Sequence, residues 1–109
     1  MLETLLGSLS KERILFYLAA RKEGYAREIS RYYKTGLTPI QKQLEKLEYG
    51  SVVYAKQAGR TRVYRLNPRY PFYSELKSLL DKAIAALPDD ELGHLINIRK
   101  RPRRKGKPI

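Results

Sequence analysis

The sequence predicts a mainly α-helical domain with one small β-wing. Apolar residues recur at three- and four-residue spacing in several stretches, which predicts amphipathic helices. Two short β-rich runs separated by a glycine predict a hairpin. At 109 residues, the chain has room for one small domain. We expect that domain to span residues 1–87, followed by a connector or short helix over 88–98 and a disordered basic tail over 99–109.

Two helices are expected in the first third of the chain. Ser10 is a suitable N-cap for the first helix, and Gly24 is a natural stop after it. The apolar stripe of this helix comprises Ile14, Leu15, Leu18 and Ala19. Ala26, Ile29 and Tyr33 mark a second helix of about nine residues, and a short turn follows it.

The next stretch predicts a third helix, from about Thr38 to Tyr49. Thr38-Pro39 is a start signal, because threonine caps free amides and proline suits the first turn, although Thr35 or Gly36 can also serve as the cap. Its apolar stripe is formed by Ile40, Leu44 and Leu47. At roughly 100° per residue, the opposite face receives a polar set. That set comprises Thr38, Gln41, Lys42, Glu45 and Lys46.

The hairpin is predicted from two runs, Val52 to Gln57 and Thr61 to Leu66. They flank the loop Ala58-Gly59-Arg60, where glycine supplies the positive φ that a tight hairpin needs. Tyr64 and Leu66 share one face of the second strand, since side chains alternate with period two. The stretch from Lys56 to Arg62 is cationic and is expected to face solvent. A loop kept soluble by its charge is the alternative interpretation.

The charge of the chain points to an anionic partner. It carries 23 Lys and Arg residues against 11 Asp and Glu residues, which gives a net charge of +12 and a pI near 10.1. Such an excess is most often matched by nucleic acid and less often by an acidic membrane surface. We find no apolar run of about 18 residues and no basic N-terminal region, and therefore expect a cytoplasmic protein without a membrane span or signal peptide.

The polar residues of the third helix suit base recognition in duplex DNA. Lysine can read guanine and glutamine can bond adenine in the major groove, so Gln41 and Lys42 are the best base-reading candidates. An ordinary solvated helix face is the alternative. The other candidate DNA contacts are Tyr25, Arg27, Thr38, Lys46, Lys56, Arg60, Thr61 and Arg62.

A further apolar stripe follows the hairpin. Asn67-Pro68-Arg69-Tyr70-Pro71 predicts a rigid connection, because each proline disfavours helix in the residue before it. The stripe comprises Phe72, Leu76, Leu79, Leu80, Ala83 and Leu87. Either the core of one chain absorbs this stripe or the same helix of a second chain covers it. We favour the homodimer, because two-fold symmetry doubles the DNA footprint.

The last part of the chain changes in composition. Pro88-Asp89-Asp90-Glu91 is an acidic helix-start signature. Residues Arg99 to Ile109 then hold seven of the 23 basic residues and no acidic one. Self-repulsion predicts a disordered arm that contacts phosphates or the minor groove, and a purely solubilising tail is the alternative.

The order of these motifs is similar to that of a known family. The residues that carry the similarity are Ile29, Gly36-Leu37-Thr38, Ile40, Leu44, Leu47-Glu48, Gly50, Gly59-Arg60, Arg62, Tyr64 and Leu66. Over roughly Leu5 to Ala86 the chain thus resembles the ArsR-type winged helix-turn-helix transcription regulators. The string Tyr64-Arg65-Leu66-Asn67-Pro68, with Pro71, Tyr73, Glu75 and Leu76, is similar to a subgroup often fused to nucleotidyltransferase domains.

This resemblance implies a recognition helix over Thr38 to Tyr49 and a wing tip over Lys56 to Arg62. Founding members of the family sense metals through cysteine thiolates. The present sequence has no cysteine and a single histidine, His94, so we expect no metal site. Pro39 and Gly50 depart from the usual spacing of the family and can re-aim the start of the recognition helix.

Together these observations predict a sequence-specific, double-stranded DNA-binding transcriptional regulator. The alternatives are a protein-interaction adaptor with the same fold and a structured-RNA-binding protein. The chain has no glycine-rich string typical of phosphate or dinucleotide binding, and no pair of carboxylates suited to acid–base catalysis. We therefore expect neither an enzyme nor a bound cofactor.

Overall fold

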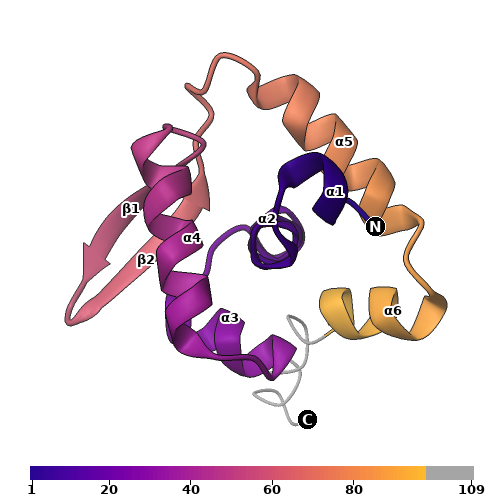
Figure 1. Ribbon diagram of the computed structural model, residues 1–109, viewed down its shortest axis with the longest axis horizontal. Helices are drawn as coiled ribbons and strands as arrows, with labels where there is room; N and C mark the ends of the chain where they lie inside the picture. The colour runs from indigo at the N-terminus through magenta and orange to yellow at the C-terminus, as the bar shows by residue number, and fades with distance from the viewer. Residues whose placement is uncertain (98–109) are drawn as a thin grey trace, which may run out of the picture.

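The computed structural model describes residues 1–97 and contains a mostly helical domain with one β-hairpin (Figure 1). The elements in chain order are α1 (Glu3–Leu6), α2 (Leu9–Arg21), α3 (Ala26–Tyr33), α4 (Leu37–Tyr49), β1 (Val53–Ala58), β2 (Thr61–Leu66), α5 (Tyr73–Ala85) and α6 (Asp89–Asn97). The predicted fold class, mainly α with a small β-wing, is confirmed. None of the described helices is long and apolar enough to span a membrane.

Helix α2 lies at the centre of the domain and is seen end-on in Figure 1. Its middle carries five consecutive buried residues, Ile14–Leu18. The other helices and β2 pack around it, with Ile29, Leu44 and Leu80 among their buried contributions. A helix that is buried on all sides needs apolar residues all round. The one polar group in this run, the Tyr17 hydroxyl, accepts a hydrogen bond from the Arg21 guanidinium at 3.0 Å.

Two helix starts differ from the sequence prediction. Helix α2 begins two residues earlier than an N-cap at Ser10 predicted, because the extended Ser8 is the N-cap and accepts a hydrogen bond from the Lys11 N–H at 3.1 Å. Helix α4 begins at Leu37 with Gly36 as its N-cap, so the alternative cap is correct and Thr38 is not the cap. Pro39 is tolerated in this first turn, where an N–H would have no intrahelical partner.

The hairpin forms as predicted, with β1 shifted by one residue from the expected run. The strands pair antiparallel from Val53 opposite Leu66 to Ala58 opposite Thr61, which leaves a two-residue turn. Gly59, with φ 64°, supplies the positive backbone angle that such a turn requires. On the other edge of β2, Gly24 forms an isolated bridge with Tyr64 through two backbone hydrogen bonds of 2.8 and 3.1 Å.

The apolar stripe of α5 is divided between the core and the surface. Leu80 and Ala83 are buried in the core of the single chain, which corrects their assignment to a dimer contact. Phe72, the residue before α5, is 62% exposed. The remaining members, Leu76, Leu79 and Leu87, are half-buried. The chain itself therefore absorbs only part of the stripe.

Residues 88–98, expected to be a connector or short helix, contain helix α6. Leu95 anchors α6 in the core, and the Arg21 Nε–H donates to the Leu95 carbonyl at 3.0 Å. The Arg21 guanidinium also lies 4.6 Å from the ring centroids of both Tyr17 and Tyr32. These contacts attach α6 to the ends of α2 and α3. The predicted basic tail, residues 99–109, lies outside the described residues.

We predict that Gly24→Ala lowers the free energy of unfolding by about 1–3 kcal/mol through overpacking. A Cβ at this position would lie 2.7 Å from Cε1 of Tyr17, whose ring is fixed in the core. Gly50→Ala is the control, because its Cβ would lie at ordinary contact distance from the carbonyl oxygens of Lys46, at 3.6 Å, and Leu47, at 4.0 Å. Urea unfolding of both variants measures the difference, and equal stabilities would contradict the prediction.

Candidate nucleic-acid interface

Helices α3 and α4 are joined by a short turn whose geometry is fixed by local hydrogen bonds. Lys34 adopts the left-handed conformation, with φ 54°, and ends α3. The Thr35 N–H donates to the Ser30 carbonyl at 3.0 Å, and the Ser30 hydroxyl donates to the Thr35 carbonyl at 2.9 Å. This reciprocal pair sets the direction in which α4 leaves the turn. The two helices form the helix-turn-helix unit that the sequence predicted.

Helix α4 presents its polar face to solvent. Its apolar stripe, Ile40, Leu44 and Leu47, is buried as predicted. All of the candidate contacts on this helix are exposed, namely Thr38, Gln41, Lys42 and Lys46. Tyr49 at the end of the helix is 95% exposed and lies eleven residues after Thr38, which is three helical turns along the same face. Sequence reasoning did not select Tyr49, although this spacing identifies its position.

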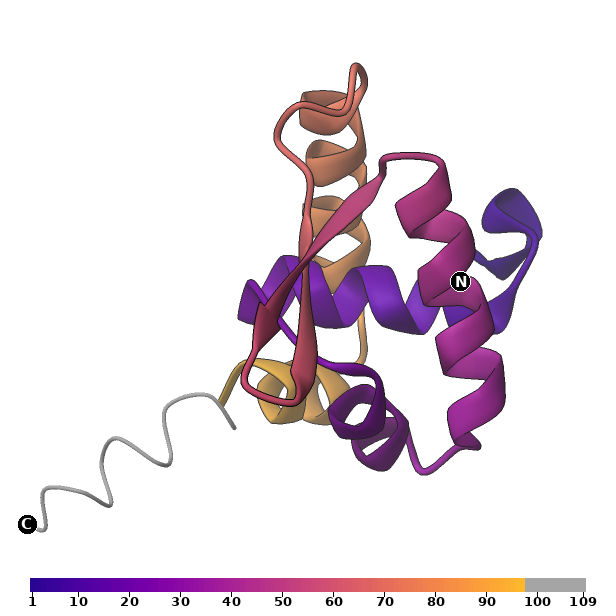
Figure 2. The ribbon, with the colours of Figure 1, turned by 90° about the vertical axis from the view of Figure 1, so that its left-hand side faces the viewer.

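The wing lies beside α4 in both views (Figures 1 and 2), and the two elements are in contact. Lys56, Arg60 and Arg62 are exposed, and Thr61 is half-buried. Arg62 lies on the same side of β2 as the buried Tyr64 and therefore faces the domain. Arg62 thus extends toward α4, whereas Lys56, which is paired with Val63, lies on the opposite face of the hairpin.

Two ion pairs hold β2 against its neighbours on opposite sides. The Arg62 guanidinium pairs with the Glu48 carboxylate of α4. The Arg65 guanidinium pairs with Glu23, in the segment between α2 and α3, with its Nε 3.0 Å from the carboxylate oxygen. Hydrogen bonding with Tyr64 and with Glu48 raises the pKa of Arg62 above its ordinary value. The wing is therefore oriented by α4 on one side and by the α2–α3 segment on the other.

A recess of about 600 Å³ lies between the start of α3, the face of α4 and the tip of the wing. We call it the basic recess, and its lining residues are Tyr25, Ala26, Arg27, Arg31, Gln41, Glu45, Arg60, Thr61, Arg62 and Tyr64. Four of these are arginines and one is acidic. Tyr25 is the N-cap of α3, where its N–H donates to Glu28 Oε1 at 3.3 Å. The recess brings three separate parts of the chain to one cationic surface.

The basic recess unites six of the ten predicted DNA contacts. These are Tyr25, Arg27, Gln41, Arg60, Thr61 and Arg62. The other four, Thr38, Lys42, Lys46 and Lys56, are exposed outside it. Sequence reasoning missed Arg31, which follows Arg27 by four residues and so lies on the same helix face. Within residues 1–97 we find no group of three His, Cys, Asp or Glu residues placed to hold a metal ion.

Solved structures share this arrangement of elements. The YusO protein from Bacillus subtilis is similar with a TM-score of 0.59 and 16% identity, covering 95% of this chain and 82% of that chain. A double mutant of Lactococcus lactis ZitR is similar with a TM-score of 0.53 and 17% identity, covering 90% of this chain and 74% of that chain. The apo form of that mutant has a TM-score of 0.54 and 14% identity, covering 97% of this chain and 89% of that chain. The chain has a winged helix-turn-helix fold. No family model and no curated protein matches its sequence.

We predict that Glu48→Gln frees the Arg62 side chain without freeing Arg65, because only the first ion pair loses its carboxylate. The order parameter of the Arg62 Nε–H bond in NMR relaxation should fall to flexible values, below about 0.6. Glu23→Gln is the matched control and should free Arg65 alone. An equal response of both arginines to either change would show that the two pairs do not act independently.

Proposed function

We propose that this protein is a sequence-specific, double-stranded DNA-binding transcriptional regulator. The single observation that supports this most strongly is the basic recess, where the wing, the start of α3 and the polar face of α4 meet. A DNA duplex offers phosphates on both sides of a groove, so a ligand of this kind engages all three elements at once. The net charge of +12 has the sign that such a partner requires.

In this proposal α4 enters the major groove as the recognition helix. Gln41 and Lys42 lie near its start and contact base edges, with Thr38 and Lys46 beside them. Tyr25, Arg27 and Arg31 at the start of α3 hold the flanking phosphates. The wing, with Lys56, Arg60, Thr61 and Arg62, contacts the backbone on the other side of the helix. Base contacts give specificity, and phosphate contacts give affinity and orientation.

The alternatives receive less support from the described surface. A protein-interaction adaptor would need an apolar patch on α4, and Tyr49 is the one large apolar side chain exposed there. Binding of structured RNA would use several exposed aromatic rings as stacking platforms. Phe72 is a further exposed ring, and it precedes α5 instead of lying on α4. Duplex DNA therefore remains our first choice over both alternatives.

We propose a cytoplasmic regulator of the ArsR type without enzymatic activity, on the motif order described above. The fusion to nucleotidyltransferase domains seen in the similar subgroup concerns relatives only, and we assign no such activity to this chain. We also propose a homodimer through the part of the α5 stripe that the core leaves accessible. Phe72 is its most exposed member.

The first test concerns specificity. Replacing Gln41 and Lys42 together by alanine should cost about 2–4 kcal/mol on the preferred DNA site, since each good base contact discriminates by about 1–3. Binding to a scrambled duplex should hardly change. Lys82→Ala, an exposed lysine on α5, is the control for loss of a positive charge. A selection of bound DNA sequences identifies the preferred site, and titrations at one salt concentration measure the affinity for both duplexes. Equal losses of affinity on the two duplexes would show that Gln41 and Lys42 contact only phosphates.

The second test concerns the homodimer. Sedimentation at micromolar concentration should give twice 12.7 kDa. Phe72→Glu should produce a folded monomer, because it places a charge in an apolar interface. Leu80→Glu should instead unfold the chain, because Leu80 is fully buried in the core. A monomeric unmodified protein in the absence of DNA would remove the dimer from the proposal while leaving the DNA-binding surface unaffected.

A further inference from the structure

A second cavity, of about 680 Å³, lies away from the basic recess and shares none of its lining residues. Its walls come from the N-terminal residues and α2, the C-terminal end of α3, and α6. The DNA-binding proposal makes no use of it. We call it the acidic cavity, because its charge and its aromatic lining distinguish it from the rest of this basic protein.

Carboxylates line the acidic cavity from two directions. Four of the chain's 11 acidic residues are among its lining residues, against two basic side chains, Arg13 and Lys34. Glu3 and Glu12 lie on the side of α1 and α2, and Asp90 and Glu91 lie on α6. The Met1 amino group adds a third positive charge, so four negative and three positive charges leave the lining with one net negative charge. On a chain with a net charge of +12, this local sign favours a cationic ligand over an anionic one.

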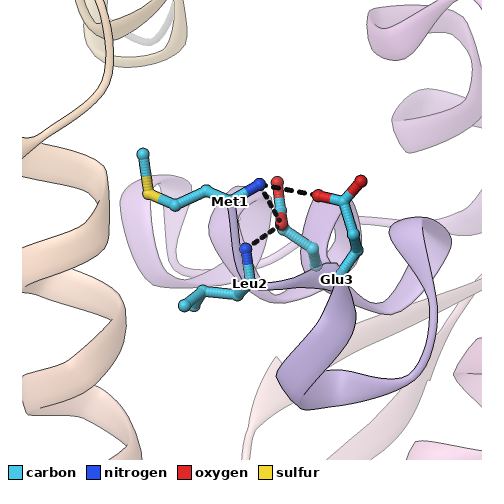
Figure 3. A network of polar contacts seen from close by, with 4 residues as sticks. Met1, Leu2 and Glu3 are labelled. Atoms are coloured by element: carbon cyan, nitrogen blue, oxygen red, sulfur yellow. Dashed lines mark hydrogen bonds and ion pairs between the residues drawn. The ribbon is translucent and has the colours of Figure 1, made fainter.

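The carboxylates on the two sides differ in their partners. Glu12, 8% exposed, accepts a hydrogen bond from the Leu2 N–H and pairs with the Met1 amino group at 3.2 Å (Figure 3). Glu3 pairs with the same amino group. These two carboxylates therefore already hold an ammonium group. Asp90 and Glu91 form neither a hydrogen bond nor an ion pair through their side chains with any residue of the described part of the chain.

Aromatic rings complete the cavity. Tyr32 stands edge-on to Tyr33, with ring centroids 4.6 Å apart, and stacks with His94 at 5.4 Å and 24°. The Arg13 guanidinium lies 5.3 Å from the centroid of the Tyr33 ring, so this lining already accommodates a cation on an aromatic ring. The electron-rich face of such a ring attracts an organic cation, and desolvation strengthens the attraction. Phe16 adds a further apolar wall.

We propose that the acidic cavity binds a small organic cation. Its ammonium group lies beside Asp90 and Glu91, and its apolar body lies against Tyr32 and Tyr33. The volume of about 680 Å³ is within the range of small-molecule sites. The inference does not depend on the proposed function, because binding to this cavity is measured without DNA.

The location also connects the cavity to the helix-turn-helix unit. Tyr33 is the last residue of α3 and Lys34 is its cap, and Gly36, the N-cap of α4, follows two residues later. A ligand that contacts Tyr33 and Lys34 therefore acts on the turn that orients α4. If it favours one orientation, it changes affinity for DNA, and DNA changes affinity for the ligand by the same factor.

The test uses the full chain and three probes of similar size and different charge: benzyltrimethylammonium, benzyl alcohol and benzoate. Isothermal titration at low salt should show saturable binding of benzyltrimethylammonium and at least tenfold weaker binding of the other two. The backbone amide signals of the protein that shift in NMR when benzyltrimethylammonium is added should belong to α6 and the end of α3. Equal or tighter binding of benzoate would overturn the assignment to cations. Absence of saturable binding by all three probes at millimolar concentration would overturn the site.

One double variant and one control variant assign the residues. Asp90→Asn combined with Glu91→Gln should weaken benzyltrimethylammonium binding by about tenfold, as expected for the loss of two charges at a partly desolvated cation site. Asp89→Asn removes the preceding charge of the same helix turn, at a position that does not line the cavity, and should leave binding unchanged. Thermal melting verifies that each variant is folded. Equal effects of the two changes would reduce the result to a general loss of negative charge and overturn the site.

Discussion

Burial of α2 is the constraint on which the other elements of the domain depend. The run Ile14–Leu18 is at most 3% exposed, so the middle of this helix must be covered on every side. Complete burial of one such side chain contributes about 1.5–3 kcal/mol, whereas an exposed ion pair contributes about 0–1. Every other helix and β2 contact α2. The relative positions of α3, α4 and the wing, and hence the shape of the basic recess, follow from how each packs on this one helix.

Tyr64 transmits that constraint to the surface. Its side chain is buried in the core, and its backbone pairs with Gly24 on one edge of β2 and with Ala55 of β1 on the other. The same residue lines the basic recess, and the guanidinium carbon of Arg62 lies 5.8 Å from its ring centroid. The base of the wing is therefore part of the core, while its tip extends into solvent. Under the proposed function, a rigid base would let the tip meet a fixed position on a duplex while α4 lies in its groove.

Local patterns in the sequence predicted the helices and strands. They could not predict the contacts between distant parts of the chain, which depend on long-range packing. The stripe of Ile40, Leu44 and Leu47 was sufficient to predict α4 and its buried face, and the alternation around Tyr64 was sufficient to predict β2. Each of these predictions depends on a single period of the apolar residues. Periodicity states that Leu80 is covered but cannot state which chain covers it. The convergence of Arg31 with Arg60 in the basic recess could not be predicted from the sequence, because the two residues are far apart in the chain and Arg31 belongs to no motif.

The ion pair between Arg62 and Glu48 has a consequence for how a phosphate would bind. Both side chains are partly exposed, so the pair contributes little net stability. Its effect is to orient the guanidinium beside α4 while the core holds the base of β2 in place. When a guanidinium binds a DNA phosphate, it also releases condensed counterions from the duplex, a favourable contribution that an ion pair with a carboxylate lacks. The pair with Glu48 therefore orients Arg62 beside α4. Under the proposed function, a DNA phosphate would take the place of Glu48 as the partner of this guanidinium.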